Sequence, residues 1–141
     1  MAKYKLRVGG GGSSDPAILD RNAASVFSDD RWVSLPEMVY LRAIKRYLLL
    51  TWRLNADFSA VDGSRLIIYD AAEPWGPFSL VHYEETWETR EKNPYCPRVP
   101  LKWLGDDGTS GWLQFSGRWF AVDGKSPYYR SHVRRFRLRL V

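Results

Sequence analysis

The chain has 141 residues, of which 45% are hydrophobic, 26% are charged and 15% are aromatic, and its formal net charge is +5. This length suits one domain, and the apolar share is too high for a disordered chain. One cysteine (Cys96) and two distant histidines (His82 and His132) exclude a disulfide framework and a zinc site made of Cys and His, and we expect no metal and no other cofactor.

Residues 1–30 are predicted to be a flexible N-terminal segment. They contain a linker, Gly9–Ser14, whose glycines and serines leave the backbone many conformations. The basic first residues lack a following apolar run, so we expect no signal peptide and a cytoplasmic location for the sequence as written. No stretch approaches the roughly 20 apolar residues of a membrane span, so we expect no membrane partner.

Residues 31–141 are predicted to be one all-β domain built from antiparallel meanders. The first unit, about residues 35–84, contains four apolar runs with the composition of β-strands. These runs are Met38–Leu41, Tyr47–Trp52, Arg65–Asp70 and Phe78–Tyr83. The pair Asp62-Gly63 indicates a turn before the third run, and Pro74-Trp75-Gly76-Pro77 interrupts the chain before the fourth.

The second unit, about residues 98–141, contains three further predicted strands. They are Val99–Leu104, Gly111–Ser116 and Ser131–Val141. A loop rich in charge, Glu84–Pro97, separates the two units. In the last run, Phe136, Leu138 and Leu140 alternate with arginines, which predicts a half-buried strand.

Three segments carry a family resemblance. Ile68–Phe78 contains a Pro-Trp-Gly-Pro turn that leads from one strand to the next. Pro100–Leu104 is followed by Asp106-Asp107-Gly108 and by Trp112–Gly117, and Arg46–Trp52 forms the third motif. Together they resemble the closing blades of a glycosidase-like five-bladed β-propeller, the domain of unknown function 4185 type, which is akin to arabinanase and xylosidase propellers.

The resemblance implies about one and three-quarter blades, too little for a complete enzyme. It also implies glycan binding or hydrolysis at the mouth of a central channel, with catalytic carboxylates mainly on earlier blades. The last unit lacks its fourth strand, which Val8 or the region Ser25–Phe27 is expected to supply. Otherwise the open strand edges would be covered by another copy of the chain, as in a homodimer.

Channel-facing residues of a propeller come from the first strand of each blade, which places the candidate site near Glu37 and Arg98. Glu37 is the candidate catalytic acid, and its alternative role is a capping carboxylate at a strand start. The candidate ligand-binding residues are Tyr40, Trp75, Tyr95, Arg98 and Lys102. Glycoside hydrolysis needs two carboxylates about 5–9.5 Å apart. Because Glu37 is a single candidate, we expect that the domain is not active alone.

The arginines of the last strand suggest a different partner. They are Arg134, Arg135, Arg137 and Arg139. They either bind a polyanion such as nucleic acid, or they lie on the solvent side of an edge strand where charge blocks unwanted pairing, and we favour the edge strand. Four hypotheses follow. They are a partial, non-catalytic propeller domain with a glycan-binding or assembly role, a homo-oligomeric interaction module, a polyanion binder and, least favoured, an active glycoside hydrolase whose second carboxylate comes from another chain.

Overall fold

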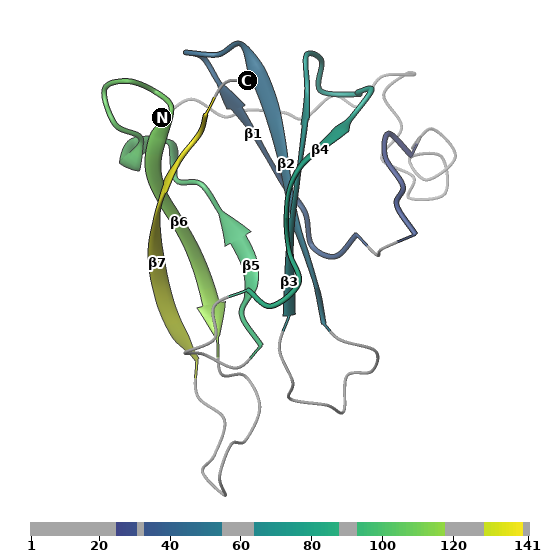
Figure 1. The fold of residues 1–141 in the computed structure, drawn as a ribbon, viewed down its shortest axis with the longest axis vertical. Helices are drawn as coiled ribbons and strands as arrows, with labels where there is room; N and C mark the ends of the chain where they lie inside the picture. Colours follow the sequence, from purple (N-terminus) through teal and green to yellow (C-terminus); the bar gives the residue numbers. More distant parts are fainter. Residues whose placement is uncertain (1–24, 31–32, 55–63, 88–92, 118–128, 140–141) are drawn as a thin grey trace, which may run out of the picture.

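The computed structural model describes residues 25–30, 33–54, 64–87, 93–117 and 129–139. They form two antiparallel sheets that face each other (Figure 1). The predicted all-β class with antiparallel meanders is confirmed, and the described strands do not close into a barrel. The predictions for residues 1–24, including Val8, lie outside the described residues. None of the described segments is a helix with the length and apolarity to cross a membrane.

The first sheet has the order β1-β2-β3-β4, so each strand pairs with its neighbour in the chain. The strands are β1 (Glu37–Leu41), β2 (Arg46–Leu54), β3 (Ser64–Ala71) and β4 (Ser79–Glu84). The β2 strand is buried on both faces, because Leu48 and Leu50 face one side and Leu49 faces the other. This double burial explains its continuous apolar run.

The second sheet has the order β5-β6-β7. Its strands are β5 (Tyr95–Arg98), β6 (Ser110–Gly117) and β7 (Arg130–Arg137), and one 3-10 turn, η1 (Leu101–Trp103), lies between β5 and β6. In β6, Leu113 and Phe115 face the first sheet while Trp112 and Gln114 face outward. The alternation predicted for the last strand is present in β7, where half-buried residues such as Arg134 and Phe136 alternate with exposed ones, and β6 alternates in the same way.

The predicted strand Val99–Leu104 is wrong, and so is the end of the predicted loop Glu84–Pro97. The strand comes earlier, as β5. Pro100 has no N–H for a ladder, and the residues after it form a single 3-10 turn in which the Trp103 N–H donates to the Pro100 carbonyl at 2.8 Å. Pro97 fits in β5 because β5 is an edge strand.

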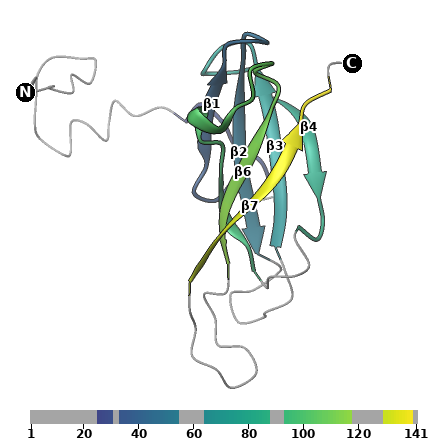
Figure 2. The same ribbon diagram turned by 90° about the vertical axis from the view of Figure 1, so that its left-hand side faces the viewer.

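The core lies between the facing sides of the two sheets. Its buried members are Val39, Leu41, Leu48, Leu50, Trp52, Leu66, Trp87, Val99, Leu113 and Phe115. Figure 2 shows β7 crossing the first sheet obliquely, toward β4. Burying one large apolar side chain contributes about 1.5–3 kcal/mol, so this interface fixes the position of one sheet on the other.

A separate cluster covers the other side of the first sheet. From the strands it contains Leu49, Ile67 and Tyr69. The ring of Phe27 packs on Tyr69 with centroids 4.5 Å apart, and on Phe78 at 5.2 Å. The expectation that Ser25–Phe27 supplies the fourth strand of the second sheet is wrong, because Phe27 packs on the face of the first sheet that points away from the second.

Turns at one end of the two sheets touch each other at Gly108. Its backbone has a φ of +62°, which favours glycine. A Cβ atom placed on Gly108 would lie 2.4 Å from the Cβ of Ala43, in the turn between β1 and β2. Both the backbone conformation and the contact with the first sheet therefore require glycine.

We predict that Gly108→Ala lowers the free energy of unfolding by more than about 1 kcal/mol, because alanine strains the left-handed backbone and collides with Ala43. Asp106→Ala, an exposed change in the same turn, should stay within about 0.5 kcal/mol of the wild type. Urea denaturation measures both values. Equal stability of the two variants would show that this contact between the turns does not hold the sheets.

Candidate functional site

Glu37, at the start of β1, joins the two sheets at their first strands. Its Oε2 atom accepts a hydrogen bond from the Val99 N–H at 2.7 Å, and its Oε1 atom lies 3.8 Å from Nη1 of Arg98. The Glu37 side chain is 23% exposed, whereas that of Arg98 is 60% exposed. The carboxylate is thus a partner of the backbone that follows β5, which matches the alternative role of a capping group.

A groove of about 540 Å³ runs beside Glu37, between β1 and η1. Two of the predicted ligand-binding residues, Tyr40 and Lys102, line it. Trp103 of η1 and Gln114 of β6 line it as well. The fold therefore brings Glu37, Tyr40 and Lys102 together. They come from distant parts of the chain, since Glu37 and its hydrogen-bond partner Val99, which lies just before η1, are 62 positions apart.

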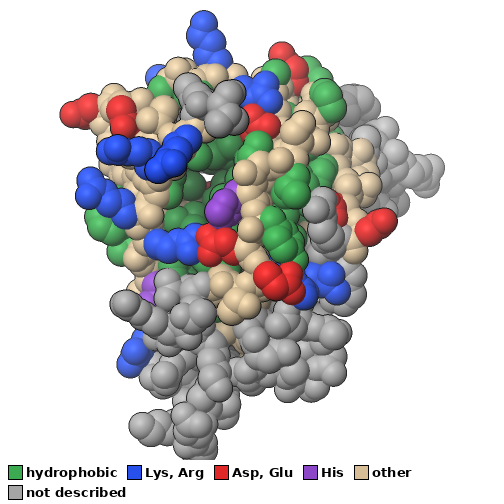
Figure 3. All heavy atoms as spheres, in the orientation of Figure 1, with side chains coloured by type: hydrophobic (Ala, Val, Ile, Leu, Met, Phe, Trp, Pro, Cys, Tyr) green, Lys and Arg blue, Asp and Glu red, His purple; other side chains and the backbone are tan. Residues whose placement is uncertain are grey.

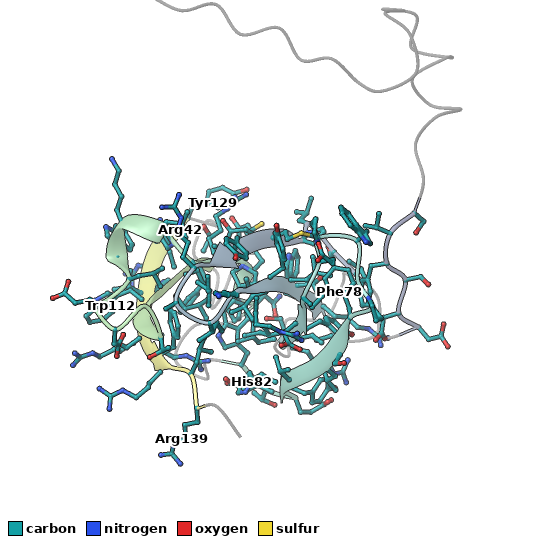
Figure 4. All side chains as sticks on the ribbon, turned by 90° about the horizontal axis from the view of Figure 1, so that it is seen from above. Arg42, Phe78, His82, Trp112, Tyr129 and Arg139 are labelled. Carbon is teal, nitrogen blue, oxygen red and sulfur yellow. The ribbon has the colours of Figure 1, made fainter. Side chains whose placement is uncertain are left out.

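Trp103 also lines a second groove, of about 470 Å³, on the outer face of the second sheet. Trp112 of β6 and Arg135 of β7 are directly opposite each other in the sheet and line this groove. Figure 4 shows Trp112 on the side of the second sheet that faces away from the first. Trp103 is 44% exposed and Trp112 is 42% exposed, so two indoles and a guanidinium are open to solvent here.

The η1 turn lies close to β6 because residue 111 is a glycine. A Cβ atom on Gly111 would be 3.0 Å from the Trp103 carbonyl oxygen and 3.2 Å from Cδ2 of Leu104. The Gly105 N–H donates to the Ser110 carbonyl at 2.8 Å, which ties the segment after η1 to the start of β6. This close approach holds Trp103 between the two grooves.

The Asp107 carboxylate orders the turn that follows η1. Its Oδ1 atom accepts hydrogen bonds from the backbone N–H groups of Thr109 and Ser110, each at 2.9 Å, and from the Ser110 hydroxyl at 2.9 Å. These hydrogen bonds favour the charged carboxylate and lower the pKa of Asp107 to about 2. The turn that carries Gly108 is therefore held by a carboxylate that stays charged at neutral pH.

Two predicted ligand-binding residues lie elsewhere. Tyr95 of β5 packs against Trp52 and Tyr129, with ring centroids 5.7 Å and 6.4 Å away, and burial raises the pKa of its hydroxyl. Trp75 is 66% exposed in the connection between β3 and β4. Neither Tyr95 nor Trp75 is among the described residues that line the two grooves.

The arginines of β7 divide between its two faces. Arg134 faces the first sheet and donates to both carboxylate oxygens of Glu84 on β4, with Nη1 at 2.9 Å from Oε2. Burial disfavours the charged form of Glu84, but the hydrogen bonds from Arg134 and His82 outweigh it and lower the pKa of this carboxyl. The outward, exposed arginines are Arg135 and Arg137 of β7 and Arg139, which follows the strand. Within the described ranges, no carboxylate pairs with these three guanidinium groups.

Groups suited to bond-breaking chemistry are few in this region. Among the described residues that line the two grooves, Glu37 is the one carboxylate. Cys96 is half-buried, and burial raises the pKa of its thiol. In the part of the chain that the structure describes, no three His, Cys, Asp or Glu side chains gather as ligands of a metal ion would.

Comparison of the chain with protein-family models, with curated proteins and with solved structures finds no match. The resemblance to glycosidase-like propellers therefore stays a prediction. The sequence reasoning missed Trp103 and Trp112 as site residues. Trp112 could have been found, because the alternation in β6 puts it on the polar face with Gln114. No local signal marks Trp103, whose position depends on the turn after Pro100.

We predict that Glu37→Ala lowers the free energy of unfolding by about 1–3 kcal/mol, since the buried Val99 N–H loses its acceptor. Glu37→Gln keeps an oxygen acceptor and loses only the exposed ion pair with Arg98, so it should cost less than about 1 kcal/mol. Chemical denaturation of the two variants tests this. If glutamine destabilises as much as alanine, the hydrogen bond to Val99 is not the main role of Glu37.

The Asp107 carboxylate should make stability depend on pH in the acid range. Because its pKa is lowered from 3.8 to about 2 on folding, its contribution is fully present above pH 4 and is lost as the pH falls through about 2. The Tm difference between wild type and Asp107→Asn should therefore shrink between pH 4 and pH 2. Asp106→Asn is the control in the same turn. A Tm difference that stays constant over this range would contradict the assignment.

Proposed function

We propose that this chain is a non-catalytic, glycan-binding domain related to glycosidase-like propellers. The observation that carries the proposal is the position of Trp103, which is exposed and lines two adjoining grooves, with Trp112 and Arg135 in the outer groove. An exposed indole offers a rigid apolar surface at little cost in conformational entropy, and it suits the apolar face of a sugar ring. Two indoles beside two grooves suit an oligosaccharide.

Polar groups around Trp103 match the chemistry of sugar hydroxyls. Tyr40 and Gln114 each offer a donor and an acceptor, and Lys102 offers donors. Hydroxyl groups need both kinds of partner, whereas a phosphate backbone needs mainly donors and positive charge. The groove between β1 and η1 thus has a mixed lining, which includes the Glu37 carboxylate, and this lining favours a glycan over nucleic acid.

The proposal that the domain is non-catalytic rests on the number of carboxylates in the grooves and on the contacts of Glu37. Glycosidases of both stereochemical classes use a pair of carboxyl groups about 5–9.5 Å apart across the scissile bond. Glu37 has its oxygens engaged by Val99 and by Arg98, and it stands without a second carboxylate among the described residues of the grooves. These features support binding without hydrolysis.

The propeller-like arrangement is supported by the pairing of the two units. Each is a meander, the two sheets pack face to face, and their first strands, β1 and β5, are linked through Glu37. Adjacent blades of a propeller are likewise meanders that pack face to face, with their first strands side by side. The open edge of β4 in the described sheet is compatible with further copies of the chain, so a homo-oligomer through that edge is part of the proposal.

A second candidate function is polyanion binding. It is favoured by one observation: Arg135, Arg137 and Arg139 lie exposed on one face of the C-terminal strand, with no carboxylate partner among the described residues. This candidate predicts an affinity that falls steeply with salt. Binding through Trp103 predicts a weaker salt dependence.

We predict that Trp103→Ala weakens binding of xylo- or arabino-oligosaccharides about tenfold or more, equivalent to ~1.4 kcal/mol or more, because it removes the indole shared by the grooves. Trp75→Ala, which removes the more exposed indole on the first sheet, should leave affinity unchanged. Isothermal titration calorimetry on the two variants measures this, with a hexasaccharide of each sugar as the ligand.

Three outcomes separate the candidates. Loss of oligosaccharide binding in Trp103→Ala, with unchanged binding in Trp75→Ala, supports glycan binding in the grooves around Trp103. Equal affinity of Trp103→Ala and the wild type for the oligosaccharides, or loss of their binding in Trp75→Ala, contradicts it. Binding of a heparin hexasaccharide or of single-stranded DNA that disappears with salt, while neutral hexasaccharides do not bind, would establish polyanion binding in place of the proposal.

A further inference from the structure

The two sheets differ in size, and the difference leaves a cleft between β7 and β4. The first sheet has four described strands and the second has three, so the second sheet ends at β7. The cleft has a volume of about 470 Å³ and continues from the core. Its apolar lining includes Leu50, Ile68, Val81, Phe136 and Leu138. Figure 3 shows hydrophobic side chains at the bottom of this hollow, with basic side chains along one side.

The cleft is bounded by one ion pair and opens along β7. The salt bridge between Arg134 and Glu84 connects β7 to β4 beside the cleft. Figure 4 shows His82 of β4 and Arg139 on the two sides of the opening. Val81 is 52% exposed, which is unusual for a side chain beside a core. The space therefore corresponds to the place where one more strand beside β7 would face β4.

The outer edge of β7 offers backbone groups to such a strand. The Leu138 N–H donates to the Thr109 carbonyl at 2.8 Å, so the even-numbered residues of this strand point their N–H groups toward β6. Successive residues of a strand alternate, so the N–H and carbonyl groups of Val133, Arg135 and Arg137 point to the other edge. In the described sheet, no strand pairs with that edge.

The side chains along this edge define the chemistry of a partner. On the inner face, Phe136 and Leu138 line the cleft, whose lining also includes His82 and Arg134. On the outer face, Arg135, Arg137 and Arg139 are exposed and have no carboxylate partner among the described residues. A strand laid beside β7 would therefore need apolar side chains on one face and acidic side chains on the other, at a period of two.

We propose that β7 binds an extended peptide segment, with alternating apolar and acidic residues, as a fourth strand of the second sheet. The apolar side chains fill the cleft against β4, and the acidic ones face Arg135 and Arg137. This is strand addition at an open sheet edge, in which backbone hydrogen bonds give affinity and alternate side chains give specificity. The peptide site shares Arg135 with the outer groove, but Trp103 and Trp112 do not line the cleft.

Charge argues against self-pairing at this edge. A second copy of β7 would place arginines against arginines, which is unfavourable for directly opposed residues. The alternating segment Tyr4–Val8 of the chain carries Lys5 and Arg7 at its polar positions, so it would bring the same repulsion. An acidic segment from another protein is the complementary partner.

The test uses a capped, fluorescein-labelled nonapeptide in which valine alternates with glutamate, and a control peptide of the same composition with the residues in blocks. We expect the alternating peptide to bind at least about tenfold more tightly than the block peptide in fluorescence anisotropy. In hydrogen exchange measured by NMR, the amides of Arg135 and Arg137 should gain protection on binding. Those of Arg134 and Phe136, which point toward β6, should change little.

Two variants separate backbone pairing from charge. Arg137→Ala should weaken the alternating peptide about two- to fivefold, and Arg137→Pro, which also removes the edge N–H, should weaken it at least about tenfold more. Trp103→Ala should leave peptide affinity unchanged, so failure of the glycan proposal and failure of this one are distinguishable. The exchange measurement on the wild type decides the matter if Arg137→Pro does not fold.

Two results would overturn the proposal. Equal binding of both peptides, without protection of the Arg135 and Arg137 amides, would mean that the arginines attract any acidic peptide at the surface. Protection of these amides before peptide is added, together with a doubled mass in light scattering, would mean that a second copy of the chain covers the edge.

Discussion

Burial of one apolar face of each sheet against the other is the interaction on which the rest of this structure depends. Leu50 and Leu66 of the first sheet meet Leu113 and Phe115 of the second in a single core. With the sheets fixed in this way, Glu37 reaches the backbone at Val99. The close approach at Gly111 then holds Trp103 at the boundary of two grooves. The proposed binding surface is thus a consequence of how the sheets pack, since its side chains come from β1, η1, β6 and β7.

The same packing accounts for the open edge. Among the described strands, four face three, so the inner side of β4 is covered only in part by them, and a cleft remains where the apolar core reaches the surface. The salt bridge between Arg134 and Glu84 crosses beside this cleft and keeps β7 near β4. The outer groove and the peptide edge share Arg135 of β7, whereas Trp103 and Trp112 line only the groove side and Phe136 and Leu138 line only the cleft.

Much of the fold follows from local sequence signals, and the site follows only in part. Alternation and turn residues suffice for six of the strands, because side-chain period and Asp-Gly or proline breaks are local properties. The strand β5 was placed too late, since prolines obscure where a short edge strand begins. Alternation predicts that Arg134 and Arg135 lie on opposite faces of the strand. Glu84, the partner of Arg134, is 50 positions away, and no local pattern identifies such a pair. For the same reason, Tyr95 was predicted as a ligand residue, although it packs against Trp52 and Tyr129.

The most direct test of glycan binding around Trp103 is an NMR titration of the wild-type protein with xylohexaose and arabinohexaose, following the indole N–H signals assigned by single Trp→Phe variants. Binding in the two grooves predicts that the signals of Trp103 and Trp112 shift with a common affinity. Those of the remote, exposed Trp75 and of the buried Trp87 should stay in place. A shift at Trp75 without one at Trp103, or no shift at any indole with either sugar, would contradict the claim that this chain binds glycans through the grooves around Trp103.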